Sequence, residues 1–140
     1  GILRSVMENL SGKEDSISYL GYLPHDRLIS RMMESELVAC LLDPENENYR
    51  VATPNKLFEA MALGIPVLVS EGTLSAEIVQ EEGCGIVISW SEEEFRNAVE
   101  MVRDPAVRRE MGEKGRRAAR EKYNWDIMKA RLLEAYRSLL

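Results

Sequence analysis

Two short apolar runs, "LVACLL" (Leu37–Leu42) and "PVLVS" (Pro66–Ser70), constrain the fold of this chain most. A strand with one solvent-exposed face alternates polar and apolar residues, and neither run does so. Short runs of this kind are typical of strands covered on both faces, which favours a parallel sheet between helices. Two further runs, Ser16–Leu20 and Gly85–Ser89, are also predicted as strands.

Helical patterns fill the intervals between these runs. Pro24 and Pro105 can occupy first helical positions, and Asp104 can cap the helix that follows it. Gly64 and Pro66 are expected to end the central helix and open the next strand. The predicted helices are Ile2–Leu10, Pro24–Glu34, Asn55–Leu63, Ser75–Glu82, Glu92–Arg103, Ala106–Tyr123 and Trp125–Leu139. The alternation predicts an α/β fold, a Rossmann-like parallel sheet flanked by helices, with a helical C-terminal third.

The composition fits one globular domain with a real core, because 45% of the 140 residues are hydrophobic and 30% are charged. A net charge of −6 disfavours a general electrostatic grip on nucleic acid or on an acidic membrane surface. An anionic ligand must therefore be held locally, and no nucleic-acid partner is expected.

Two other features bear on compartment and metals. Cys40 and Cys84 lie in apolar stretches without a CxxC pair or a histidine cluster, so we expect reduced core residues, no zinc site and no cofactor. No apolar run approaches the roughly 18 residues that span a bilayer, and the N-terminus lacks a signal-peptide pattern. The sequence predicts a soluble, cytoplasmic protein.

The start of the central helix carries an unusual lysine. Thr53 is a suitable N-cap and Pro54 a suitable first residue, which leaves Asn55, Lys56 and Leu57 in the first turn. A lysine there opposes the helix macrodipole at a cost of about 0.3–1 kcal/mol, and a bound anion reverses that effect. The pattern predicts a phosphate-bearing ligand held by backbone N–H groups and the ammonium.

Glu59, about one turn further along, offers two carboxylate oxygens to hydroxyl groups such as a ribose diol. The helix follows a strand, and open α/β sheets bind ligands at the carboxyl ends of their strands. The alternative is that Lys56 and Glu59 form only a solvated ion pair three residues apart.

Five segments, in order, resemble a known family: "YLGYLPHDRL", "SELVACLLDP", "PNKLFEAMALGIPVLVSEG", "EIVQEEGCGIVI" and "YNWDIMKARLLEAYRSLL". They are similar to the C-terminal, donor-binding half of retaining glycosyltransferases of the family 4 group, which have the GT-B fold. The resemblance covers nearly the whole chain, and the third segment is its most specific part.

The resemblance implies a nucleotide-sugar donor and assigns roles around the central helix. Glu59 matches the second of the family's two glutamates, which contacts the ribose, and the N–H groups of Asn55–Leu57 match the segment facing the diphosphate. Val51 stands where the first glutamate is expected. Asn48, Thr53 and Asn55 are candidates to replace some of its polar contacts.

Other residues take less specific roles. Gly21 and Tyr22 are candidates for the base pocket, although a turn-forming role is equally open. His25 is expected to be structural or on the surface. Tyr123 and Trp125 are expected to anchor the last helix by packing.

Parts of the family pattern are missing from the sequence. By the strand order 3-2-1-4-5-6, Ser16–Leu20 would be strand 3 and Leu37–Leu42 strand 4, so strands 1 and 2 and the basic pair after strand 1 are absent. The acceptor domain is absent too. We expect a truncated chain, part of a larger enzyme, or another chain that fills the gap. Peripheral membrane association of the full enzyme is open, but the basic run Arg108–Lys122 is expected to be a solvated helix face.

Three functional readings follow. The first is the donor-binding domain of a glycosyltransferase whose complete form transfers a sugar with retention, this chain alone being inactive. The second is a non-catalytic nucleotide-binding or scaffolding module acting with a partner subunit. The third, a two-component receiver domain, could use Asp43 but lacks a visible acidic pair.

Overall fold

The structure is a computed structural model that describes residues 4–139. The chain divides into two compact units, residues 1–30 and residues 31–140. Helix α2 (His25–Met33) crosses this boundary.

The first unit contains α1 (Arg4–Lys13) and the extended segment after it. The Ser11 hydroxyl donates to the carbonyl of Ile17 at 3.0 Å and accepts from the N–H of Tyr19 at 3.0 Å. The strand predicted over Ser16–Leu20 is wrong, because these residues bond back to α1 instead of entering a ladder. The first two residues of the helix predicted from Ile2 lie outside the described residues.

The second unit is built on a parallel sheet of three strands, β1 (Val38–Cys40), β2 (Val67–Ser70) and β3 (Gly85–Ile88), in that order. Val67 is in register with Val38 on one side and with Gly85 on the other. The three strands predicted here are confirmed, each shorter than expected by one to three residues. All four residues of β2 are buried, as its lack of polar alternation indicates.

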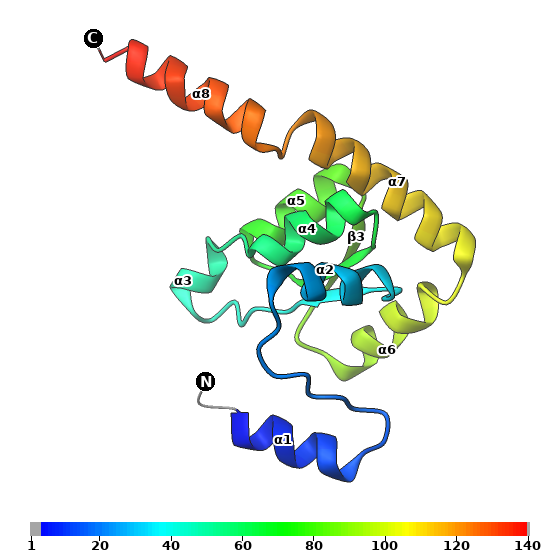
Figure 1. The fold of residues 1–140 in the computed structure, drawn as a ribbon. Helices are drawn as coiled ribbons and strands as arrows, with labels where there is room; N and C mark the ends of the chain where they lie inside the picture. Colours follow the sequence, from blue (N-terminus) through cyan, green and yellow to red (C-terminus); the bar gives the residue numbers. More distant parts are fainter. Residues whose placement is uncertain (1–3, 140) are drawn as a thin grey trace. The chain divides into compact units, whose positions relative to one another are not determined.

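Helices cover both faces of this sheet (Figure 1). Helix α4 packs on β1 and β2, and α5 packs on β2 and β3. On the opposite face, Ala98 of α6 packs against Leu68 and Ile88. Side chains alternate along a strand, so Val67 and Val69 point toward α4 and α5 while Leu68 points toward α6. The helices of this unit after β1 are α3 (Glu47–Arg50), α4 (Asn55–Leu63), α5 (Leu74–Glu82), α6 (Glu92–Met101), α7 (Pro105–Glu121) and α8 (Trp125–Arg137).

The helix ends follow the sequence signals closely, with one correction. Asp104 caps α7 through a 2.8 Å bond from the N–H of Ala106, and Gly64 ends α4 with a φ of 73°. The N-cap of α4 is Pro54, not Thr53 as predicted, and the helix begins at Asn55. Proline fixes its own φ and has no hydroxyl, so no side chain caps this helix start. The short helix α3 was not predicted.

Helix α7 lies directly against the C-terminal end of α4. A Cβ atom on Gly112 would overlap the carbonyl oxygen of Gly64, so only glycine permits this approach. Arg116 then donates from Nε and Nη2 to the carbonyl of Leu63, at 3.2 and 2.8 Å. These bonds satisfy one of the carbonyls that a helix end leaves without an intrahelical partner.

We predict that Gly112→Ala lowers the free energy of unfolding by about 1–3 kcal/mol, because the added methyl group overpacks a backbone contact. Urea denaturation followed by circular dichroism measures the change. Gly12→Ala is the matched control: a Cβ there meets no atom within 4 Å, so its effect is at most a small stabilisation. Equal stability of the two variants would contradict the close α4–α7 contact.

Candidate functional site

The start of α4 lies beyond the carboxyl end of β1, where the sequence placed the site. The N–H of Leu57 bonds to the carbonyl of Pro54 at 2.9 Å, which leaves Asn55 and Lys56 as the donors at the very end of the helix. The loop before α4 is held by a 3.0 Å bond from the Ser75 hydroxyl on α5 to the carbonyl of Ala52. The helix start is therefore fixed in position without a side-chain cap.

The Lys56 ammonium reaches back to the sheet, donating to the carbonyl of Ala39 in β1 at 2.8 Å. The N–H of Val38 bonds to the carbonyl of Pro66 on the β2 side. Successive peptide groups of a strand point to opposite edges, so the carbonyl of Ala39 points to the other edge of β1. An ammonium carries three donors, so this bond leaves Lys56 able to contact an anion as well.

The remaining residues of α4 divide into a buried and a polar side. Leu57, Ala60 and Met61 are fully buried against the rest of the unit. Lys56 is exposed and Glu59 is half-buried, on the side that the apolar residues leave open. The carboxylate and the ammonium are thus held on one helix, about a turn apart, and their ligand roles stay predictions.

The other predicted site residues lie in different surroundings. Thr53 is half-buried, Asn55 is exposed, and Val51, at the C-cap of α3, is 71% exposed. Gly21 and Tyr22 belong to the first unit, where Gly21 has a φ of 66° and Tyr22 is 95% exposed. Their proposed contact with a base stays a prediction.

A pocket of about 510 Å³ lies beside the start of α4. Its residues come from the α4 start and from the junction of α7 and α8: Thr53, Asn55, Phe58, Tyr123, Asn124, Trp125 and Met128. The rings of Phe58 and Tyr123 pack with centroids 5.4 Å apart, which confirms the anchoring role expected for Tyr123. Trp125 is 71% exposed, so the packing role expected for it is wrong.

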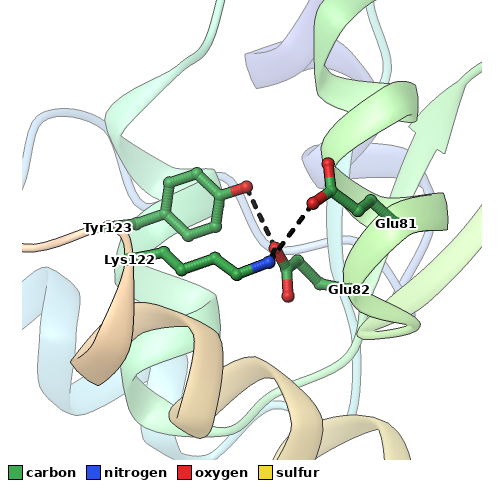
Figure 2. Close-up of polar contacts among 4 residues, drawn as sticks. All are labelled: Glu81, Glu82, Lys122 and Tyr123. Atoms are coloured by element: carbon green, nitrogen blue, oxygen red, sulfur yellow. Dashed lines mark hydrogen bonds and ion pairs between the residues drawn. The ribbon is translucent and has the colours of Figure 1, made fainter.

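The α7–α8 junction is fastened to the end of α5 by four side chains (Figure 2). The Tyr123 hydroxyl donates to Glu82 at 3.1 Å, and the Lys122 ammonium donates to Glu82 at 2.7 Å and to Glu81 at 3.2 Å. The hydrogen bonds to Glu82 and Glu81 raise the pKa of Lys122. Burial, followed by the bond to Glu82, raises the pKa of Tyr123. No sequence signal pointed to this cluster, because its members are about 40 residues apart.

We predict that this cluster weakens in alkali. Both pKa values are raised on folding, so the stability they contribute is complete below the ordinary values of 10.0 for tyrosine and 10.5 for lysine and is lost as pH rises through the folded values. Tyr123→Phe and Lys122→Met should each flatten the fall of melting temperature above pH 10. Arg96→Met, on a solvated pair in α6, is the control and should leave that fall unchanged. An unchanged profile in all three variants would contradict the cluster's role.

Both cysteines and Asp43, which the sequence singled out, have defined surroundings in the structure. Cys40 and Cys84 are buried and free, and burial raises the pKa of Cys84 to about 11. Asp43 accepts a bond from the N–H of Glu45 at 3.0 Å. Within residues 4–139, no three histidine, cysteine or acidic side chains gather as a metal site. In the same range, no helix is long and apolar enough to cross a membrane.

Residues 4–134 match the family described as "Glycosyl transferase-like". The chain belongs to this family. No curated protein sequence matches this chain.

Two solved structures share the fold of this glycosyl transferase-like chain. Sucrose-phosphate synthase from Thermosynechococcus elongatus matches with a TM-score of 0.82 and 24% identity, over 99% of this chain and 35% of that one. WaaG, a glycosyltransferase involved in lipopolysaccharide biosynthesis, matches with a TM-score of 0.65 and 21% identity, over 86% of this chain and 31% of that one. The predicted likeness to the GT-B fold is thus confirmed. This chain spans about a third of the length of each of the two structures.

Proposed function

We propose that this glycosyl transferase-like chain is the part of a glycosyltransferase that binds a nucleoside diphosphate sugar. The start of α4 carries the proposal. It presents the N–H groups of Asn55 and Lys56, the Lys56 ammonium and, one turn on, the Glu59 carboxylate, beyond the carboxyl end of β1. Helix N–H groups and an ammonium suit a diphosphate, and a carboxylate suits a ribose diol.

The complete enzyme would transfer the sugar to an acceptor with retention at the anomeric carbon. In that reaction the bond between the sugar and the diphosphate breaks, and negative charge collects on the leaving diphosphate. Preorganised N–H groups and an ammonium stabilise that charge as it forms, without reorganising during the step. A separate acceptor domain, which the resemblance implies, would bind the acceptor, and the residues of this chain alone would not turn over.

A second candidate is a non-catalytic nucleotide-binding or scaffolding module that acts with a partner subunit. Val51 favours it, because an exposed apolar side chain stands where the resemblance puts a sugar-contacting glutamate. Nucleotide binding separates the donor site from the scaffolding form of this candidate. Saturable binding of a nucleoside diphosphate supports the donor site, and its absence with UDP, GDP and ADP supports the scaffold.

We predict that calorimetric titration finds saturable binding of one of these diphosphates. Glu59→Ala should weaken that binding about 10- to 100-fold, the effect of removing a charged hydrogen-bond acceptor. Glu134→Ala, which removes an exposed carboxylate from α8, is the matched control and should bind like the parent chain. Equal loss in both variants would indicate a general charge effect and argue against a ribose contact at Glu59.

The role of Lys56 is tested by removing the charge of its side chain while keeping a similar size. Lys56→Met should weaken diphosphate binding about threefold to tenfold and reduce its sensitivity to salt, whereas Lys56→Arg keeps both. Because Lys56 also bonds to Ala39, urea denaturation of each variant shows whether the fold is intact. Unaltered affinity in a folded Lys56→Met chain would remove the ammonium from the proposed site.

A further inference from the structure

The pocket beside α4 combines two kinds of wall. One wall is aromatic, with Phe58, Tyr123 and Trp125, and Met128 extends it along α8. The rim toward the α4 start is polar, with the hydroxyl of Thr53 and the amide of Asn55. Small-molecule sites typically pair apolar surface of this kind with a few placed polar groups.

The aromatic wall is held in place before any ligand arrives. Tyr123 is fixed at both ends, since its hydroxyl bonds to Glu82 and its ring packs on Phe58. The amide of Asn124 is used by the protein, accepting from the N–H of Ile127 at 3.0 Å and donating to the carbonyl of Arg120 at 2.7 Å. These bonds fix the first turn of α8, from which Trp125 projects with 71% of its surface exposed.

The exposed indole of Trp125 lies near the hydroxyl of Thr53 and the amide of Asn55. This combination suits a ligand that has both an apolar face and polar groups. A pyranose ring has an apolar face of C–H bonds, which stacks on an aromatic ring, and hydroxyl groups around its edge, which bond to amides and hydroxyls. A hydrocarbon chain could not form hydrogen bonds with the hydroxyl of Thr53 or the amide of Asn55. The pocket also shares these two residues with the α4 start, so a sugar here would lie next to the proposed diphosphate.

We propose that this pocket binds the pyranose ring of a carbohydrate substrate, stacked on Trp125 and positioned by the Glu82–Tyr123 bond. The inference rests on the proposed function for its choice of a sugar, and it adds Tyr123 and Trp125, to which the resemblance gives no contact with a ligand. The ring could belong to the donor or to the acceptor. Its chemistry is the same in both cases, and the experiment separates the two sources.

The fluorescence of Trp125 can report on binding in this pocket. The chain has two tryptophans, and Trp90 lies outside the pocket. In the Trp90→Phe chain, we expect sugar binding to shift the emission of Trp125 to shorter wavelength and to saturate. The probes are UDP, UDP-glucose and GDP-mannose for the donor. For the acceptor they are the methyl pyranosides of glucose, mannose and galactose, each at millimolar concentration with UDP and GDP present.

The outcomes separate the sources. A shift with a nucleotide sugar but not with its nucleoside diphosphate assigns the ring to the donor. A shift with a methyl pyranoside assigns it to the acceptor. The same shift with UDP alone would place the nucleotide in the pocket and overturn the inference. No shift with any sugar would overturn it too, while calorimetric binding of a diphosphate in the same chain would leave the proposed function standing.

Two variants test the residues. Tyr123→Phe keeps the ring and loses the bond to Glu82, so it should weaken sugar binding about threefold to tenfold. In the Trp125→Ala chain, saturation-transfer NMR should find the transfer to the bound sugar lost, whereas Trp90→Ala keeps it. Circular dichroism checks that each variant is folded. Retained transfer in folded Trp125→Ala would exclude the stacking role.

Discussion

The contact between α7 and the end of α4 is the constraint on which the rest of the second unit depends. Helix α4 has the proposed site at one end and this contact at the other, where Gly112 lets α7 approach and Arg116 bonds to the carbonyl of Leu63. A helix of nine residues is marginal by itself in water, so α4 owes its stability to packing on its neighbours. What fixes its far end therefore also fixes the direction of its first N–H groups.

The same helix pair shapes the pocket. Helix α7 meets α4 at the C-terminal end of α4 and runs along it. It then turns into α8 beside the first turns of α4, where Tyr123 packs on Phe58. The bonds of Lys122 and Tyr123 to Glu82 tie this turn to α5 as well. Three helices from separate parts of the chain thus meet around one short stretch, Thr53–Phe58, which the proposed function and the further inference share.

Local signals in the sequence predicted the second unit well and the first unit poorly. The apolar runs gave three strands, and Gly64, Asp104 and Pro105 gave helix ends, because each of these features acts within a few residues. Ser16–Leu20 has the composition of a strand, but a strand needs a partner, and no pattern in one sequence reports the bond to Ser11 that formed instead.

The candidate site shows the same division. The start of α4 could be found from Thr53 to Glu59 alone, since a helix start and its charges are local features. The pocket could not be found in this way, because Tyr123 and Trp125 reach it from far along the chain. An aromatic residue in a helix also looks the same in sequence whether its ring is packed or exposed. The exposure of Trp125 depends on how the whole second unit is folded, so the sequence around it does not reveal it.

The bond from Lys56 to Ala39 has a consequence beyond ligand chemistry. Peptide groups on the outer edge of a strand can template pairing with strands of other molecules, and a lysine laid across such an edge discourages it. At β1 the ammonium occupies the outward carbonyl of Ala39, so any strand that pairs on this edge, including the strand 1 expected beside it, has to displace that bond. Lys56 therefore links strand pairing at this edge of the sheet to the proposed ligand site, because its one ammonium would take part in both.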